Sequence, residues 1–432
     1  MSKLFLSSDQ ELLLSLLCIP TENPLETGYV TDLRKAQMLY AEYAKKLGFE
    51  IIYHQSPPKS IIDDPDVPLS VVEMFNQLGE VFLETQPNLV LRVGPAREIS
   101  KTIMFNFHMD TVKGTPLVKL ENNKIFGRGT VDMKGAGVAI LAGIRDAINN
   151  TPELIKHISI IVQCVSGEEG GAMGIYGTKL LAELGYLGKL NIFAEATNGC
   201  YFDHSTASST VNISICGVDA IDDNPNEGHN ATIFLGYLAS SLAENMANEI
   251  EQCGGKICIA GIKTGEMHNQ VYGSGSLKII FAYNSKMLGN WIEQKFEEAF
   301  ALECAKFEKN FGSVNIAKKI ASEIKNVSSY KWIKKGLPVL NNRHPEMEKI
   351  FAIAGIKRIS EDELSRTFTC DAIWVNSPNT YTVVFGPGNL VKNGAHTDNE
   401  FIKLEELERY SFQISKLVRL FYNRRKQETI SI

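Results

Sequence analysis

The chain has 432 residues, of which 44% are hydrophobic and 22% are charged, and its formal net charge at pH 7 is −6. This composition excludes wholesale disorder, and the length indicates two or three domains at about 150 residues each. A mildly acidic chain lacks the basic surface typical of nucleic-acid binding, and no apolar run approaches the ~18 residues of a membrane span, so we expect neither partner.

The N-terminal segment and the cysteines indicate a cytoplasmic protein. Asp9 and Glu11 interrupt the first apolar stretch, which therefore does not resemble a secretory signal. The eight cysteines form no C-x-x-C pair, and most lie in apolar runs typical of reduced, buried side chains. A cytoplasmic location follows as the expectation.

Helix and strand patterns alternate through the first 200 residues. Such alternation predicts an α/β domain with a mostly parallel central sheet flanked by helices. Residues 55–80, rich in Pro and Asp, form an insertion between two of the strands. Helices are predicted from Ser8-Asp9-Gln10-Glu11, which resembles a capping box, and over 31–47, 132–148 and 174–184. Strands are predicted over 49–54, 88–93, 102–110, 158–165 and 191–195.

The pattern changes after about residue 206. Strand, helix, strand, strand and helix on one open sheet form an α+β module of ferredoxin-like type. These elements are predicted over 209–217, 229–250, 256–263, 275–283 and 286–310, and the tail then returns to α/β character at 345–354, 381–386 and 404–423. We therefore expect a catalytic domain in two segments, 1–206 and 329–432, with a second domain inserted at 207–328.

Histidine and carboxylate side chains gather where predicted strands end. Ligands of an open α/β sheet collect at the carboxyl ends of its strands, so these side chains should converge on one crevice. Taken singly, each has an ordinary explanation as a structural histidine, a solvated Glu pair or turn chemistry. Together they form a nitrogen and oxygen donor set that suits zinc, cobalt or manganese. The set comprises His108, Asp110, Asp132, Glu168, Glu169, Glu195 and His396.

The number of donors is enough for two cations. A carboxylate can bridge two metals and an imidazole cannot, so one shared Asp with one His and one Glu on each side provides two adjacent sites. Two cations about 3.5–4 Å apart can activate a water and polarise a carbonyl together. We therefore expect two divalent metal ions, most simply zinc, with cobalt or manganese as alternatives.

Five separated motifs, in this order, closely resemble those of the di-zinc aminoacylase and metallopeptidase family. That family includes acetylornithine deacetylase, succinyl-diaminopimelate desuccinylase, glutamate carboxypeptidase and related dipeptidases. The resemblance covers nearly the whole chain, which makes it far more specific than any one motif. The motifs are H-M-D at 108–110, G-R-G-x-x-D-M-K-G around Asp132, G-E-E-G-G around Glu168, Glu195-Ala-Thr, and G-P-G…A-H-T-D-N-E around His396.

The resemblance implies a metal role for five residues. Asp132 would bridge both metals. His108 and Glu195 would complete one site, and Glu169 and His396 would complete the other.

The resemblance also implies the reaction, which is hydrolysis of the amide bond of an N-acylated amino acid or dipeptide-like substrate. Glu168 would act as general base and then as general acid. Asp110 would hydrogen-bond His108 and fix its tautomer. The peptide bond between Asp132 and Met133 would be cis. The inserted module would be a lid and would pair with its twin in a homodimer, through an exposed sheet edge.

The inserted module departs from the family pattern at two positions. Ile221 stands where family members have a histidine that supports the oxyanion, and Tyr283 stands near the place of an arginine that grips the substrate. Losing one oxyanion donor typically costs ~10²–10³ in rate. His229 and His204 are weak candidates to replace it, and both are more simply explained as loop or surface histidines.

Three further residues are singled out beyond the five motifs. Asn269 matches an Asn that the family uses near the substrate. Arg366 could bind a substrate carboxylate, although a surface salt bridge explains it equally well. Asp371 matches a family Asp, with no role assigned.

The departures in the inserted module keep two other hypotheses open. A metal-retaining family member could use altered chemistry, such as amide formation or acyl transfer in a biosynthetic pathway. A non-catalytic binding protein is the third, and the complete set of ligands and base argues against it.

Overall fold

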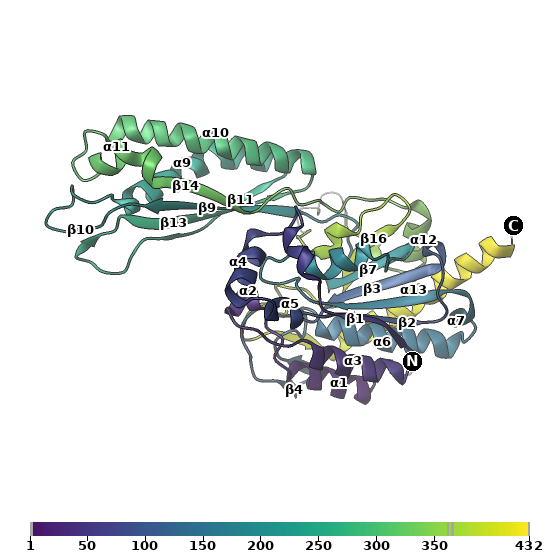
Figure 1. Ribbon diagram of the computed structural model, residues 1–432. Helices are drawn as coiled ribbons and strands as arrows, with labels where there is room; N and C mark the ends of the chain where they lie inside the picture. Colours follow the sequence, from purple (N-terminus) through teal and green to yellow (C-terminus); the bar gives the residue numbers. More distant parts are fainter. Residues whose placement is uncertain (1–2, 361–362, 364–366, 431–432) are drawn as a thin grey trace. The chain divides into compact units, whose positions relative to one another are not determined.

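The computed structural model describes residues 3–360, 363 and 367–430, and the chain divides into two units (Figure 1). Unit 1 comprises Met1–Ser205 and Leu340–Ile432, and unit 2 comprises Thr206–Val339. Unit 2 ends beyond the expected 328 because strand β14 (Ser328–Lys334) belongs to its sheet. The chain therefore enters and leaves unit 2 through two connecting segments.

Unit 1 is built on a six-stranded sheet. Strands β6, β3, β7 and β16 run parallel to one another, whereas β2 is antiparallel to both β1 and β6. This confirms the predicted mostly parallel sheet. The order across the sheet is β1 (Glu50–Gln55), β2 (Asn88–Val93), β6 (Ser159–Val165), β3 (Thr102–His108), β7 (Leu190–Ala196) and β16 (Tyr381–Gly386).

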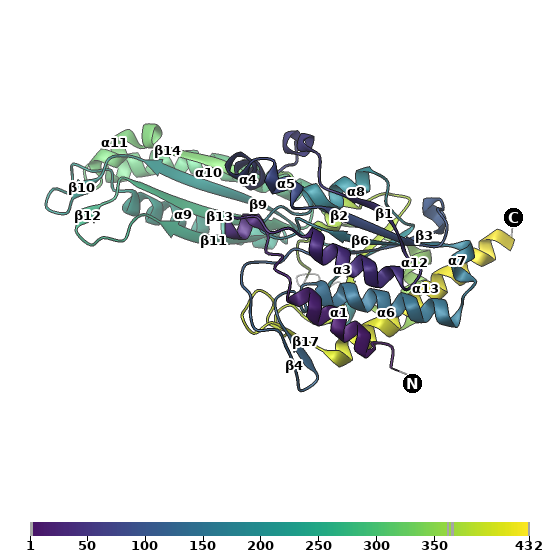
Figure 2. The same cartoon turned by 60° about the horizontal axis from the view of Figure 1, so that its bottom comes forward.

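Both faces of this sheet are buried. Successive residues of a strand point to opposite faces, so a strand that is buried throughout is covered on both sides. Leu89 and Leu91 of β2 join one apolar cluster, and Val90 between them joins another. The first cluster includes residues of the four helices that lie side by side in Figure 2, and residues of α12. These helices are α1 (Ser7–Leu17), α3 (Arg34–Lys45), α6 (Lys134–Asn150) and α13 (Leu404–Ile430), with α12 at Pro345–Ala354.

Local signals explain where two of these helices begin. Pro345 occupies the first turn of α12, and Gly355 ends that helix in the left-handed conformation at φ 78°. The predicted capping box of α1 was two residues late, because the N-cap is Leu6 and not Ser8. Asp9 accepts a hydrogen bond from the backbone N–H of Leu6 at 2.7 Å, so the helix begins at Ser7.

The predicted insertion between β1 and β2 is largely helical. Its apolar side chains, including Val71 and Phe82, pack against Ala172, Ile175 and Tyr176. The insertion thus supports the segment that follows Glu168 and Glu169. It contains the 3-10 helix η1 (Lys59–Asp63), α4 (Leu69–Leu78) and α5 (Val81–Glu84), and it packs on the π-helix η3 (Ile175–Lys179).

Two small sheets and several short helices complete unit 1. One antiparallel sheet consists of β4 (Lys119–Glu121), β5 (Lys124–Phe126) and β17 (Phe401–Lys403), and it joins segments far apart in the sequence. The other pairs β8 (Cys200–Tyr201) with β15 (Lys357–Arg358). The short helices are α2 (Pro24–Thr27), η2 (Ile99–Lys101), α7 (Leu154–His157), α8 (Leu180–Glu183) and η5 (Asp371–Trp374).

Unit 2 is a four-stranded antiparallel sheet with helices packed against it. This confirms the predicted α+β module, although α11 (Lys318–Val327) and β14 were not predicted. The sheet order is β11 (Lys256–Lys263), β13 (Ser274–Tyr283), β9 (Ala207–Cys216) and β14. The remaining elements are α9 (Ala231–Gln252), α10 (Lys286–Phe311) and the pair β10 (Ala220–Ile221) with β12 (Gln270–Val271).

The eight cysteines are all free, but only Cys164, Cys304 and Cys370 are buried. The expectation that most are buried was therefore wrong, because several lie on half-exposed elements of unit 2. Within the described part of the chain, no helix has both the length and the apolar character needed to cross a membrane.

Replacing Gly143 in α6 with alanine should destabilise the protein. The new Cβ would lie 2.5 Å from the carbonyl oxygen of Ser411 and 2.7 Å from Cβ of Ile414, both on α13. We expect a loss of about 1–3 kcal/mol in the free energy of unfolding, the usual effect of overpacking. Urea denaturation followed by circular dichroism measures it.

Gly236→Ala in α9 is the matched control for this prediction. A Cβ at Gly236 would enter open space. Removing a glycine from a helix interior should then stabilise the protein by about 0.5–1 kcal/mol. Stability changes of the same sign in the two variants would contradict the prediction.

Candidate metal and catalytic centre

Parallel strands of unit 1 bring the predicted site residues to one edge of its sheet. His108 is the last residue of β3, and Glu195 lies at the carboxyl end of β7. Glu168 and Glu169 follow β6 after a turn, and His396 lies in the long loop after β16. Since these strands run in the same direction, their carboxyl ends meet at the same edge.

Asp132 lies between the two histidines, in the turn that precedes α6. Its Oδ1 is 3.0 Å from Nε2 of His108, and its Oδ2 is 3.0 Å from Nε2 of His396. Each imidazole also faces a glutamate. His108 Nε2 is 3.6 Å from Oε1 of Glu195, and His396 Nε2 is 3.4 Å from Oε1 of Glu169. The Asp132 carboxylate is therefore shared by two groups of donors.

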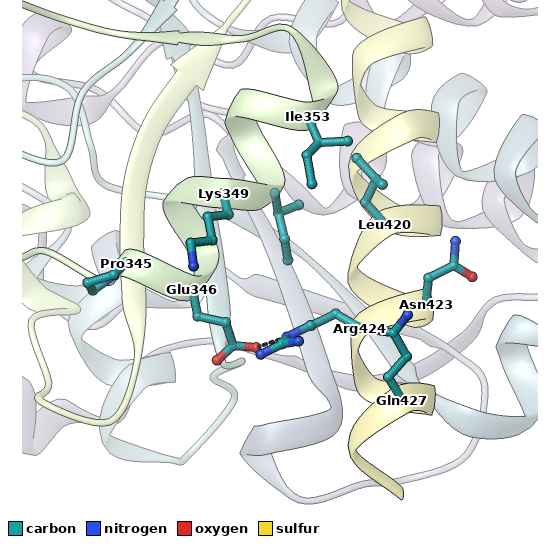
Figure 3. Close-up of a pocket in the computed structure, with 9 residues that line it drawn as sticks. Pro345, Glu346, Lys349, Ile353, Leu420, Asn423, Arg424 and Gln427 are labelled. Carbon is teal, nitrogen blue, oxygen red and sulfur yellow. Dashed lines mark hydrogen bonds and ion pairs between the residues drawn. The ribbon is translucent and has the colours of Figure 1, made fainter. Parts of the chain in front are cut away.

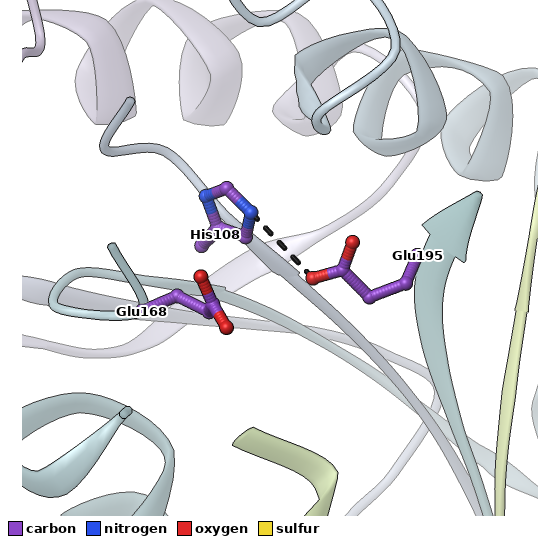
Figure 4. Close-up of side chains that lie close together, drawn as sticks. All are labelled: His108, Glu168 and Glu195. Atoms are coloured by element: carbon purple, nitrogen blue, oxygen red, sulfur yellow. Dashed lines mark ion pairs between the residues drawn. The ribbon is translucent and has the colours of Figure 1, made fainter. Parts of the chain in front are cut away.

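Two sets of three side chains have donor atoms close enough to hold one cation, and both sets include His108. Donor atoms of His108, Glu168 and Glu195 lie within 4.8 Å of one another, and so do those of His108, Asp132 and Glu169. Figure 4 shows the carboxylates of Glu168 and Glu195 beside the His108 ring. Glu168 is half-buried, whereas the other four side chains are buried. Glu168 is thus the carboxylate of this group with the greatest access to solvent.

Asp110 acts differently from the expectation. Nδ1 of His108 lies 2.8 Å from the backbone carbonyl oxygen of Asp110, and the carboxylate of Asp110 is farther away at 3.9 Å. That carboxylate accepts hydrogen bonds from Asn23 Nδ2 at 2.8 Å and from the backbone N–H of Glu169 at 3.1 Å. Asp110 therefore fixes the His108 ring through its main chain and the Glu168–Glu169 turn through its side chain.

The peptide bond between Asp132 and Met133 is cis, as the resemblance implied. Asp132 and Met133 are both buried, directly before α6.

Burial and the closeness of several carboxylates shift the pKa values of the site residues in the absence of metal. Burial, and then repulsion by Glu169, raises the pKa of Glu168 well above its usual range. Burial and the neighbouring Asp132 likewise raise the pKa of Glu195. Burial alone would raise the pKa of Asp132 too, but hydrogen bonds with His108 and His396 lower it overall. Without cations, protons therefore occupy this edge of the sheet.

The nitrogen and oxygen donors of this set suit divalent cations. Ligand atoms about 2.0–2.2 Å from a tetrahedral zinc lie about 3.3–3.6 Å from one another. The two His–Glu separations, 3.6 Å for His108–Glu195 and 3.4 Å for His396–Glu169, fall in this range, whereas the two His–Asp132 separations of 3.0 Å are shorter. Buried carboxylates also need compensating charge, which cations would supply.

The residues of unit 2 that the sequence singled out have structural partners or lie exposed. Ile221 is 58% exposed on β10, and Asn269 is exposed in the segment before β12. Tyr283 is buried and donates to the carbonyl oxygen of Leu337 at 3.1 Å. His229 accepts from the backbone N–H of Val218 at 2.9 Å. None of these contacts assigns an oxyanion donor.

The remaining candidates lie in unit 1. His204 is 2.5 Å from the carboxylate of Asp203 through Nδ1, so its ring has a partner within unit 1. Asp371 is buried and accepts a hydrogen bond from Thr178, and burial raises its pKa to about 6. Arg366 lies outside the described residues.

Two residues near the site were missed at the sequence level. Asn23 holds the carboxylate of Asp110, and Glu400 accepts from the loop that carries Asp132. Glu400 ends the quoted A-H-T-D-N-E motif, so the motif itself contained the signal. For Asn23 the sequence held one local signal: an Asn directly before a Pro is typical of a helix N-cap, and this signal does not indicate a role beside Asp110.

A separate cavity of about 620 Å³ lies between α12 and α13 (Figure 3). Apolar side chains such as Ile353 and Leu420 line it, and Glu346 pairs with Arg424 at 3.0 Å. Among the residues that the structure describes, none of the predicted site residues lines this cavity, so it is not the candidate catalytic site.

Comparison with known proteins gives a family match over most of the chain. Residues 104–419 match the family described as Peptidase family M20/M25/M40. A Staphylococcus epidermidis protein named "Probable succinyl-diaminopimelate desuccinylase" is 26% identical over 347 residues, covering 74% of this chain and 82% of that protein. A Rickettsia bellii succinyl-diaminopimelate desuccinylase is 33% identical over 162 residues, covering 34% of this chain and 39% of that protein.

Solved structures share the fold along nearly the whole chain. A tripeptidase from Staphylococcus aureus superposes with a TM-score of 0.65 at 17% identity, covering 96% of this chain and 99% of that chain. Human carnosine dipeptidase 1 superposes with a TM-score of 0.59 at 12% identity, covering 97% of this chain and 98% of that chain. At these identities the likeness shows the fold alone.

Metal binding should release protons and weaken as the pH falls. Hydrogen bonds with Asp132 and then Glu169 raise the pKa of His396 to about 11 in the metal-free protein. Burial and then Asp132 raise the pKa of Glu169 to about 7. A cation must displace these protons in order to bind. For each proton displaced, the affinity for the metal falls about tenfold for every pH unit by which the pH drops below the pKa of that group. Zinc affinity should therefore fall about a hundredfold or more between about pH 8 and about pH 6.

Isothermal titration calorimetry at both pH values, in two buffers of different ionisation enthalpy, measures the affinity and counts the protons released. A zinc affinity that stays constant over this range, with no proton release, would contradict the prediction.

Proposed function

The chain belongs to Peptidase family M20/M25/M40, and we propose that it hydrolyses the amide bond of an N-acylated amino acid or a peptide-like substrate at a dinuclear metal centre. Membership alone makes it a metallohydrolase that acts on amide bonds. The dinuclear centre, the zinc and the substrate class are the proposed part.

One observation carries the proposal for two metals. The two oxygens of Asp132 each lie 3.0 Å from a different imidazole, His108 on one side and His396 on the other. A carboxylate that only neutralised one histidine would not divide its oxygens in this way. We propose that Asp132 is shared by two cations, with Glu195 completing one ligand group and Glu169 the other.

Zinc suits two imidazoles with several carboxylates, and cobalt or manganese remain the alternatives. When bound, such a pair of cations would lower the pKa of a water and polarise the scissile carbonyl. Metal analysis of protein purified without added metal distinguishes the three.

Glu168 is the residue that we propose moves the proton. Its carboxylate lies close to His108 and Glu195 and is half-buried. Its neighbour Glu169 instead faces His396, at 3.4 Å. Glu168 would take a proton from the attacking water and pass it to the leaving nitrogen, which yields a carboxylic acid and an amine. Asp110 would hold the turn at Glu168 and Glu169 in place through its hydrogen bond from Glu169.

The substrate class is supported by the names of the sequence relatives. The relatives from Staphylococcus epidermidis and Rickettsia bellii are named as succinyl-diaminopimelate desuccinylases. That name refers to an amide whose nitrogen belongs to an amino acid. We propose the same class of amide here, with Asn269 as a substrate contact and the acyl group left to experiment.

Amide formation, the alternative raised by Ile221, is not favoured, because the relatives and neighbours named above are hydrolases by name. The exposed Ile221 and the buried Tyr283 fit instead with a hydrolase of altered substrate preference. A homodimer formed through unit 2 and a cytoplasmic location also remain proposals. Analytical ultracentrifugation tests the homodimer, because it measures the mass of the protein in solution. The strands through which such a dimer would form are β11 and β14, the two edges of the unit 2 sheet.

Glu168→Gln should abolish hydrolysis while the metals stay bound. Removing a positioned general base and acid typically costs about 10²–10⁴ in rate. The assay is mass-spectrometric detection of products from N-acyl amino acids, dipeptides and tripeptides, with zinc-loaded protein. Zinc content measured in parallel should remain that of the wild type.

Glu169→Gln is the matched neighbour control. It removes a proposed ligand, so it should lower the zinc content as well as the rate. Undiminished hydrolysis by the Glu168→Gln protein would rule out the proposed role of Glu168. Condensation products without hydrolysis in the wild type would favour the alternative chemistry.

A further inference from the structure

The side chain of Glu400 enters the loop that carries Asp132. Its Oε1 accepts the backbone N–H groups of Gly129 at 3.0 Å, Val131 at 3.1 Å and Asp132 at 3.4 Å. The Glu400 side chain is completely buried. A carboxylate that collects several N–H groups of one turn fixes the backbone of that turn, and here the turn ends at Asp132.

Arg128 extends this arrangement to the segment after His108. Its Nη1 lies 2.8 Å from Oε2 of Glu400, with only 7% of the side chain exposed. The same guanidinium donates to the carbonyl oxygens of Gly114 at 3.3 Å and Lys113 at 3.4 Å. Arg128 therefore joins Glu400 to the stretch that begins at His108.

Glu400 also belongs to the loop that carries His396, four residues earlier. Its carbonyl oxygen accepts from the N–H of Gly127 at 3.1 Å. The next residue, Phe401, pairs with Phe126 in the small sheet formed by β5 and β17. The loop of His396 is thus fastened to the loop of Asp132 by the main chain as well.

We propose that Glu400 and Arg128 are positioning residues that hold the Asp132, His396 and His108 segments in register for metal binding. This inference rests on the proposed function, because it assumes that these three residues are ligands. Neither Glu400 nor Arg128 is proposed to touch a metal or the substrate.

Stability alone does not distinguish a positioning role from a structural one. Removing one partner of a buried ion pair leaves the other charge unpaired, which destabilises the fold wherever the pair lies. Residues that orient metal ligands nevertheless affect binding strongly, and their replacement typically weakens metal affinity about 10–100-fold. His396 depends most on this support, because its side chain is 54% exposed and it lies in a loop. His108 and Glu195 instead lie at the ends of buried strands.

The test is a competitive zinc titration of Glu400→Gln against a chelator. The substitution keeps the size of the side chain and removes its charge, so the pair with Arg128 is lost. The variant should bind one of its two zinc ions about 10–100-fold more weakly than the wild type. Arg128→Lys, which keeps the charge and loses the forked contacts, should change affinity in the same direction.

Asp9→Asn is the matched control, because it breaks a similar ion pair away from the site loops. The buried Asp9 carboxylate accepts from Arg145 Nη2 at 2.7 Å and from the N–H of Leu6 at 2.7 Å, and it joins α1 to α6. Thermal unfolding of each variant without metal measures the loss of stability. Asp9→Asn should lower the melting temperature while both zinc affinities stay unchanged.

Each result has a distinct meaning. Weakened zinc binding in Glu400→Gln, with unchanged binding in Asp9→Asn, supports the positioning role. Wild-type zinc affinity in folded Glu400→Gln and Arg128→Lys proteins overturns it while the proposed function stands. If Glu400→Gln does not fold, Arg128→Lys alone decides between these two results. A wild-type protein that binds no zinc overturns the proposed function and the inference together.

Discussion

Concentration of negative charge at one buried edge of a sheet is the constraint on which this structure depends. The carboxylates of Asp132, Glu169 and Glu195 are buried within a few ångströms of two imidazoles. Such a cluster is costly without compensating positive charge. Protons supply that charge in the metal-free protein, and divalent cations would supply it in the proposed enzyme. The surrounding elements hold the cluster together against its own repulsion.

Three kinds of support act on this cluster. Parallel strands place His108 and Glu195 on a rigid frame whose two faces are both buried. Hydrogen bonds to the Asp110 carboxylate hold the turn of the two glutamates, and the insertion between β1 and β2 packs behind that turn. The loops of Asp132 and His396, which lack a strand of their own, are joined through Glu400. Side-chain hydrogen bonds therefore hold the turns and loops of the site, which no strand of the central sheet supports.

The proposed donors and the proposed base all lie in unit 1, whereas the departures at Ile221 and Tyr283 lie in unit 2. The side chain of Ile221 has no hydrogen-bond donor, and the hydroxyl of Tyr283 donates to the carbonyl oxygen of Leu337. We infer that the reaction class follows from unit 1, whereas the acyl group and the amine must be found by experiment.

The sequence by itself determined the family and most elements, and it indicated the candidate donor set. Strand β16 and helix α12 were predicted to the residue, because β-branched runs, Pro345 and Gly355 are local signals. Tertiary structure alone decided what depends on partners distant in the chain. Strand β14 has no clear alternation, and it is a strand because β9 lies beside it. The carboxylate of Asp110 turned toward Asn23 and Glu169 instead of His108, and Glu400 reached a loop some 270 residues away. Spacing along a sequence records residue types and local propensity, but hydrogen-bond partners are chosen in the packed fold.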